Sequence, residues 1–161
     1  MDFRISRSSV SGMDDAAFFW ALIEPLWPDV NVVDELRHLS AATPGQQALY
    51  ATTVFLREVD NGGLEQFFYN SSGLYTEAVR VGLRLLGAAQ HLAALEAAIG
   101  LFPGAQVPVD GEERAKAIQG ITRERGRRVF EEMDDQLFGE DRLWPFFRRY
   151  VEKHPEEFFM D

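Results

Sequence analysis

The chain has 161 residues, of which 46% are hydrophobic and 12% aromatic, and this composition excludes a disordered protein and fits one domain with a sizeable core. It has no cysteine, which excludes disulfides and thiolate metal sites and favours a reducing compartment. The 26 acidic residues outnumber the 16 basic ones, and the formal net charge of −10 disfavours direct binding to nucleic acid or to an anionic membrane surface.

The first ten residues lack the apolar stretch of a signal peptide, and no apolar run approaches the ~20 residues that a membrane span needs. We therefore expect a soluble, cytoplasmic protein. Residues 1–10 are a candidate for a disordered end of the domain.

The pattern of apolar residues is helical along nearly the whole chain. The first predicted helix begins after Ser11 or Asp14, either of which can cap it, and Pro25 and Pro28 end it. Its expected buried face carries Phe18, Phe19, Leu22 and Ile23.

The second predicted helix has a clearer start. Thr43 can serve as the N-cap, Pro44 occupies the first helical position, and Gln46 can complete a capping box. This helix is expected to run to about Val59 and to stop at residues 61–63, where two glycines follow an asparagine. A short aromatic turn of helix comes next.

Two amphipathic helices and a long polar one are predicted in the middle of the chain. The expected buried faces carry Tyr75, Val79, Leu83 and Leu86 in the first helix, and Leu92, Leu95, Ile99 and Phe102 in the second. Residues 103–104 close the second helix, and residues 105–111 form a loop. The polar helix is predicted over 112–138, although Gly120 and Gly126 each weaken it by about 1 kcal/mol relative to Ala.

The last predicted helix ends before His154 and places Leu143, Phe146, Phe147 and Tyr150 on one face. We expect Phe158 and Phe159 to belong to a C-terminal segment that packs against the domain. The alternative is that they form a homodimer interface with Trp144. Strand signals are scarce. The sequence therefore predicts a single all-α domain over residues 1–161, a multi-helix bundle in which orthogonal packing is expected.

No catalytic or metal-binding motif is present. The three histidines, His38, His91 and His154, lie on different predicted helices, so none is paired at the spacing that a helical metal site needs. There is no nucleophile elbow, P-loop or dinucleotide-binding fingerprint. We therefore predict no cofactor, no metal and no catalytic residue, and we expect a protein that is not an enzyme.

Two charged clusters stand out. Six basic residues between 114 and 128 are interpreted as a solvated helix face whose long stems cover apolar surface. Residues 131–141 hold six carboxylates in eleven positions: Glu131, Glu132, Asp134, Asp135, Glu140 and Asp141. If helical, this segment spans about 16 Å, a length over which duplex DNA carries about ten charges. We predict that these six residues form an acidic surface that binds a partner.

The most distinctive segment is the run NGGLEQFFYNSSG over 61–73, which places glycines and polar turn residues on both sides of an aromatic turn. The polar side chains of this run are suited to helix caps and turns, and its aromatic side chains are suited to a core. This combination indicates a structural motif. The residues concerned are Asn61, Gly62, Gly63, Gln66, Phe67, Phe68, Asn70, Ser71 and Gly73.

The run 61–73 resembles the signature of the bacterial DNA-mimic-protein family, a domain of otherwise unknown function; Leu64 stands where a Phe would be expected. The similarity continues through 85–88 and 99–104 and, more loosely, through 133–138 and 150–158. The resemblance implies an all-helical domain. In the member that gave the family its name, it also implies an acidic surface that imitates DNA and occupies the site of a DNA-binding protein.

The sequence is compatible with three functions. The leading hypothesis is an acidic interaction domain that competes with DNA for a basic partner, a DNA-binding protein, through the carboxylates of 131–141. One alternative is an immunity or antitoxin-like protein that neutralises a basic toxin. The other is a small hydrolase with a carboxylate site, which predicts a pocket lined by two converging acids.

Overall fold

A computed structural model of the chain describes residues 2–27, 37 and 39–161, apart from the side chains of residues 140 and 141. The α-helices of this part are α1 (Asp15–Ile23), α3 (Pro44–Tyr69), α4 (Thr76–Leu86), α5 (Ala89–Ile99), α6 (Gly111–Arg125), α7 (Glu131–Asp134) and α8 (Trp144–Lys153). Short 3-10 helices connect them: η1 (Arg7–Val10), η2 (Glu24–Leu26), η3 (Ser71–Tyr75), η4 (Pro103–Ala105), η5 (Glu140–Leu143) and η6 (Pro155–Glu157). No helix of the described residues has the length and apolar character that crossing a lipid bilayer requires.

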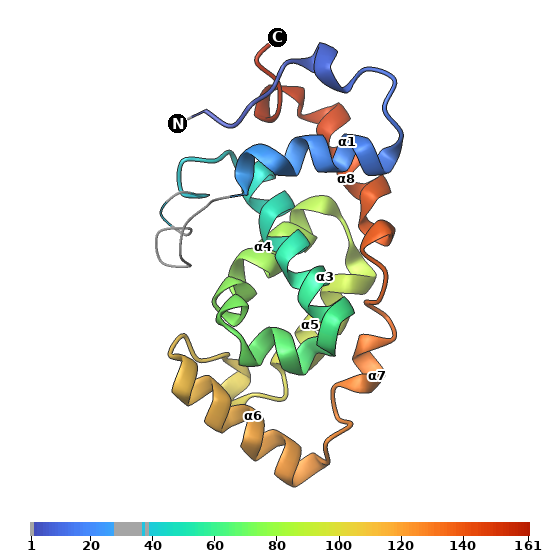
Figure 1. The fold of residues 1–161 in the computed structure, drawn as a ribbon. Helices are drawn as coiled ribbons and strands as arrows, with labels where there is room; N and C mark the ends of the chain where they lie inside the picture. Colours follow the sequence, from blue (N-terminus) through green and yellow to red (C-terminus); the bar gives the residue numbers. More distant parts are fainter. Residues whose placement is uncertain (1, 28–36, 38) are drawn as a thin grey trace.

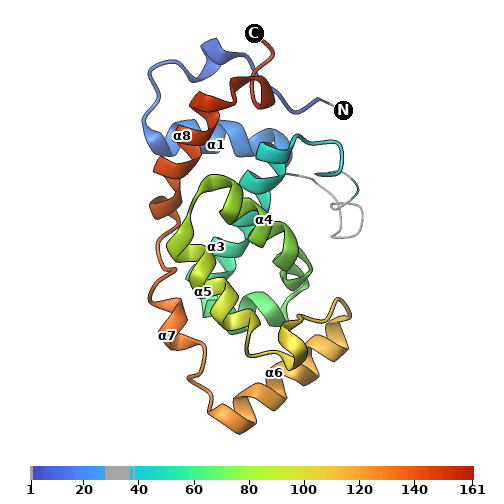
Figure 2. The same cartoon turned by 180° about the vertical axis from the view of Figure 1, so that it is seen from behind.

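The helix α3 runs through the middle of the molecule (Figure 1). One end of α3 is crossed by α1, along which α8 lies, and α6 lies at the opposite end. Seen from behind, α4 and α5 cover the other side of α3, and α7 stands between α6 and α8 along one edge (Figure 2). The predicted all-α bundle with steeply crossing helices is thus confirmed.

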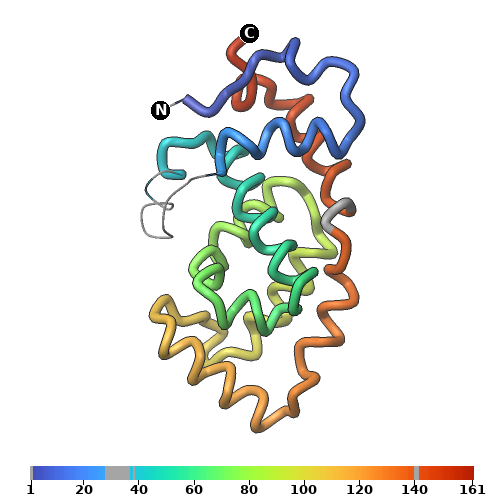
Figure 3. Tube along the Cα trace, viewed as in Figure 1, coloured from blue at the N-terminus to red at the C-terminus, as the bar shows by residue number. Residues whose placement is uncertain are grey.

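The two ends of the chain lie at the same end of the molecule (Figure 3). The backbone of Ile5 pairs with that of Phe159 in an isolated parallel bridge, and Phe3 is buried. Residues 2–10, a candidate for disorder in the sequence, are thus held against the C-terminal segment. Phe158 and Phe159 are buried, and Trp144 packs against the core, so these aromatic residues belong to the interior of the chain.

Local side-chain chemistry sets the starts of the first two long helices. The carboxylate of Asp14 accepts a hydrogen bond from the backbone N–H of Ala17 and caps α1. The predicted capping box of α3 is present, because the Thr43 hydroxyl accepts from the N–H of Gln46 and the Gln46 side chain accepts from the N–H of Thr43. Both caps satisfy helix N–H groups that would otherwise lack a partner.

The helical ladder of α3 breaks where the sequence predicts an end. Gly62 and Gly63 have non-helical backbone angles, with φ +76° at Gly63, a conformation that is costly for residues with a Cβ. The chain then resumes helix from Leu64 to Tyr69. The aromatic turn is therefore a second segment of α3, set at an angle to the first.

The prediction of one long helix over 112–138 is wrong. The helix α6 ends at Arg125 because Gly126 adopts φ +94°, and α7 begins only at Glu131. The interpretation of the basic stretch is also wrong for Arg114, which is only 2% exposed. These two departures bear directly on the candidate site.

Candidate functional site

The second segment of α3 is capped from α7, 70 residues away. The backbone N–H of Leu64 donates to Oδ1 of Asp134 at 2.7 Å, in a buried position. A Cβ on Gly63 would collide with the Asp134 carboxylate. Gly63 therefore serves two purposes, because it supplies the positive φ of the break and leaves room for the carboxylate that caps the restarted helix.

This arrangement corrects the expected role of Asp134. The residue is 7% exposed, so it is not part of an acidic surface. Burial raises the pKa of its carboxyl above the usual value of 3.8, the Leu64 N–H lowers that pKa in part, and the charges of Glu131, Asp135 and Glu65 raise it further. A buried carboxylate with a specific donor is a structural cap in this position.

A second hydrogen bond holds the same two segments together. The backbone N–H of Gly139 donates to Oδ1 of Asp60 at 2.9 Å. Asp60, just before the break in α3, and Leu64, just after it, therefore both form hydrogen bonds to the segment 134–139. We call this arrangement the α3–α7 clamp, formed by Asp60, Leu64, Asp134 and Gly139.

The clamp gathers exposed carboxylates from two distant parts of the sequence. Glu65, Glu131, Glu132 and Asp135 are exposed. The charges of Glu65, Glu131 and Asp135 all raise the pKa of Asp134, so these three carboxylates lie around the buried one. We call the four exposed side chains the acidic surface. The side chains of Glu140 and Asp141 lie outside the described residues.

One cation of the basic stretch reaches this surface. Arg128 Nε lies 2.5 Å from Glu131 Oε2, and the two side chains are 87% and 53% exposed. An ion pair this open to water is weak and yields readily to another cation. Glu132, Asp135 and Glu65 form no ion pair with the described residues.

The polar residues that follow the break converge on Glu58, which precedes it in α3. Its Oε2 accepts from Gln66 Nε2 at 2.7 Å and from Asn70 Nδ2 at 3.0 Å, and its Oε1 accepts from the Ser72 hydroxyl at 3.0 Å. Glu58 lies before the motif, and sequence reasoning missed it. A regular helix would separate Glu58 from Gln66 by about 12 Å along its axis, so the contact depends on the break at Gly62 and Gly63 and no local sequence signal predicts it.

The end of the motif is held by the buried Arg114. Its guanidinium donates to the backbone carbonyls of Phe68 at 2.5 Å and Asn70 at 3.0 Å, at the C-terminus of α3. It also donates to the carbonyls of Pro108 and Val109. A Cβ on Gly73 would lie 2.5 Å from Arg114 Nε, so this glycine leaves space for the guanidinium.

A pocket of about 530 Å³ opens over Glu58. Its lining combines aromatic residues, amides, hydroxyls and one charge of each sign. The lining residues are Trp27, Tyr50, Val54, Arg57, Glu58, Asn61, Gln66, Asn70, Ser71, Ser72 and Tyr75. Among the motif residues, Asn61, Gln66, Asn70 and Ser71 thus face this pocket, whereas Phe67 and Phe68 are fully buried in the core.

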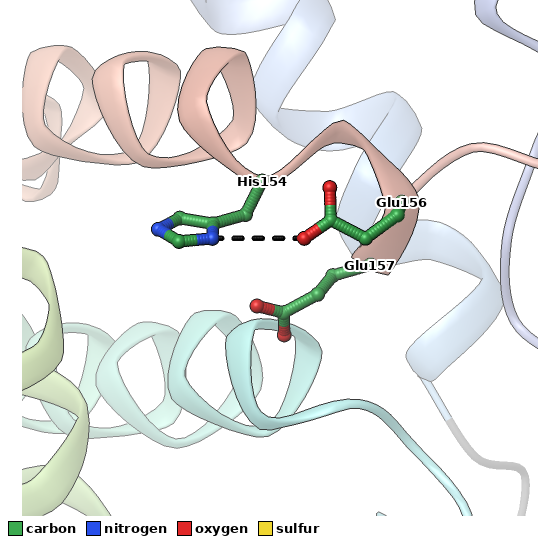
Figure 4. Close-up of side chains that lie close together, drawn as sticks. All are labelled: His154, Glu156 and Glu157. Atoms are coloured by element: carbon green, nitrogen blue, oxygen red, sulfur yellow. Dashed lines mark ion pairs between the residues drawn. The ribbon is translucent and has the colours of Figure 1, made fainter.

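The C-terminal segment brings three potential metal ligands together. One ligand atom from each of His154, Glu156 and Glu157 lies within 4.8 Å of the others, and His154 Nδ1 is 3.7 Å from Glu156 Oε1 (Figure 4). Both oxygens of Glu157 already accept hydrogen bonds, from the Tyr150 hydroxyl at 2.7 Å and from the N–H of Gly45 at 2.5 Å. We therefore interpret the cluster as a tie between the C-terminal segment and the start of α3. Of the other histidines, His91 is buried and His38 lies outside the described residues.

Comparison with known proteins gives one match. No curated protein and no solved structure matches the chain. A family model described as DMP19-like protein matches residues 40–154, a range that includes the motif, Glu58, Arg114 and both sides of the clamp. Since this match spans well over half of the 161 residues, the chain belongs to the DMP19-like protein family.

Proposed function

We propose that this protein is a non-enzymatic interaction protein whose acidic surface takes the place of DNA phosphates on a basic DNA-binding protein. The observation that supports the proposal is the hydrogen bond from Leu64 to Asp134, which joins α3 to α7, together with the charges of Glu131, Asp135 and Glu65, which all act on the Asp134 carboxyl. Membership of the DMP19-like protein family supports the same function.

Competition would follow from charge alone. Lysine and arginine side chains that neutralise phosphates on DNA would pair instead with Glu65, Glu131, Glu132 and Asp135. The net charge of −10 adds a long-range attraction that speeds encounter with a basic protein. Both contributions weaken in salt, since exposed charges are screened beyond ~8 Å at physiological ionic strength.

The test is capture of partners from a host lysate on the immobilised protein at low salt, followed by elution in a salt gradient. We expect one basic DNA-binding protein to elute with salt and to be displaced by duplex DNA. The identified partner is then purified, and its affinity is measured directly with and without a DNA competitor. A partner that binds DNA and this protein at the same time would contradict the proposal.

Two matched variants test the assignment of the surface. Lysine at positions 131, 132 and 135 reverses three charges of the acidic surface, whereas lysine at Glu112, Glu124 and Glu152 makes the same change in net charge at exposed sites elsewhere. The first variant should abolish binding, and the second should weaken it only slightly through the lost long-range attraction. Equal losses in both would show that total charge acts without a specific surface.

The alternatives make different demands. An immunity or antitoxin-like protein would use the same acidic surface on a basic toxin, and a neighbouring toxin gene together with rescue of toxin-expressing cells would distinguish it. A small hydrolase requires two acids in one pocket. Five pockets formed by the described residues contain one carboxylate at most, so this alternative gains no support.

A further inference from the structure

We propose that the pocket over Glu58 binds a free α-amino acid, with the ammonium group on Glu58 and the carboxylate on Arg57. The lining of this pocket includes no residue of the acidic surface, and the inference does not rest on the proposed function. It starts from the polar residues of the motif, which converge on one carboxylate inside a pocket of about 530 Å³.

The three donors to Glu58 are neutral groups: two amides and one hydroxyl. They orient the carboxylate and leave its negative charge uncompensated, and among the described residues Glu58 forms no ion pair. A carboxylate offers about four acceptor positions, of which the three donors occupy three. The Glu58 carboxylate can therefore accept a hydrogen bond from a cationic ligand.

The cation at the mouth of the pocket is held by aromatic side chains. The Arg57 guanidinium carbon lies 5.2 Å from the ring centre of Trp27 and 5.9 Å from that of Trp20. Arg57 is exposed and forms no ion pair with the described residues. Stacking against two indoles orients this planar cation and leaves its N–H groups available to a carboxylate.

One positive and one negative group, neither of which has an ionic partner among the described residues, line a single small pocket. A purely cationic ligand would be repelled by Arg57, and a purely anionic ligand by Glu58. A zwitterion satisfies both, and its charges are neutralised without leaving either protein group unpaired. The remaining wall of Trp27, Tyr50 and Val54 is largely apolar and favours an amino acid with an apolar side chain.

Isothermal titration calorimetry on the full chain tests the ligand class with three probes that share one side chain. These are L-leucine, its methyl ester, which keeps only the positive charge, and N-acetyl-L-leucine, which keeps only the negative charge. L-phenylalanine, its methyl ester and N-acetyl-L-phenylalanine are titrated in parallel as a second series with a larger apolar side chain. We expect one of the two free amino acids to bind at least about tenfold more tightly than its ester and N-acetyl derivatives, because each derivative loses one charge-assisted contact. An ester that binds as tightly as the amino acid, or no binding of either amino acid at millimolar concentration, would overturn the proposal.

Two variants place the ligand in the pocket. Arg57→Gln changes an exposed side chain and should weaken binding at least about tenfold, whereas Glu124→Gln, at an exposed acid of α6 outside the pocket, should leave binding unchanged. Glu58→Gln is expected to act like Arg57→Gln but also removes acceptors of the motif. Asn61→Trp therefore provides a second test, since Asn61 lines the pocket and is exposed, and the added bulk should block binding in a folded protein. Binding that survives both Arg57→Gln and Asn61→Trp would show that the ligand sits elsewhere.

Discussion

The motif at 61–73 and the acidic segment at 131–141 are far apart in sequence, and their structural roles differ from their appearance. The motif has the polar, glycine-rich composition of a binding loop, yet Phe67 and Phe68 are buried in the core. Gly63 and Gly73 leave space for the side chains of Asp134 and Arg114. The acidic segment has the composition of a solvated surface, yet Asp134 is buried and caps the motif. Asp134 is buried and its neighbour Asp135 is exposed, so charge density along a sequence overstates the charge that the folded protein presents at its surface.

The largest expected effect comes from removing the cation that closes the motif. Arg114→Met should destabilise the protein by about 3–5 kcal/mol, because four backbone carbonyls lose a buried donor. Lys116→Met, at an exposed position of the same helix, should change stability by less than about 0.5 kcal/mol. Urea unfolding of both variants measures the difference, and similar values would contradict the role of Arg114.

A smaller loss is expected at the break in α3. Gly63→Ala should cost about 2–3 kcal/mol, because the positive φ is unfavourable for alanine and the new methyl group displaces the Asp134 carboxylate. Gly126→Ala is the matched control, since Gly126 has φ +94° and ψ 156°, close to the φ +76° and ψ −177° of Gly63, but its added Cβ would meet nothing within 4 Å. It should show only the backbone cost of about 1–2 kcal/mol. If thermal unfolding gives equal losses, the clamp contributes nothing at Gly63.

The two neighbouring aspartates should separate stability from binding. Asp134→Ala is expected to cost about 1–3 kcal/mol, because the buried N–H of Leu64 loses its acceptor. Asp135→Ala should change stability by less than about 0.5 kcal/mol and should weaken binding of the basic partner. Urea unfolding and partner titration on the same two variants check this. An Asp134→Ala variant with unchanged stability would refute the cap.

The pH dependence is the finest test of the clamp. The pKa of Asp134 is raised by burial and by neighbouring carboxylates, so the folded state keeps a proton that the unfolded state has already lost above pH 3.8. The contribution of this group to stability is therefore largest below that pH and is lost as pH rises through the folded-state pKa.

Asp134→Asn keeps an acceptor for Leu64 but does not titrate. The free energy of unfolding of this variant, relative to the unchanged protein, should therefore increase as the pH is raised from about 4 to 7. Urea unfolding across this range measures the trend. A relative stability that falls with rising pH would show that the native carboxyl is preferentially ionised.

Most of the secondary structure is predictable from the sequence, because helix caps and glycine breaks depend on residues close together in the chain. The capping box at Thr43 and Gln46 and the cap at Asp14 act within one turn, so the helix starts were predictable from adjacent residues. The break after Asn61 was predictable because glycine permits backbone angles that other residues avoid. The break at Gly126 was missed because glycine inside a polar helix costs only about 1 kcal/mol, and the sequence does not say which glycine adopts a positive φ.

The candidate sites were decided by tertiary structure, because each depends on pairs of residues far apart in the chain. Asp134 meets Leu64 across 70 positions, and Arg114 meets Phe68 across 46. Periodicity cannot distinguish Asp134 from Asp135 or Arg114 from Lys116, since a short segment with charges in most positions has no apolar stripe to orient it. Only the packing of α3 against α6 and α7 selects which charge is buried with a partner and which remains in water.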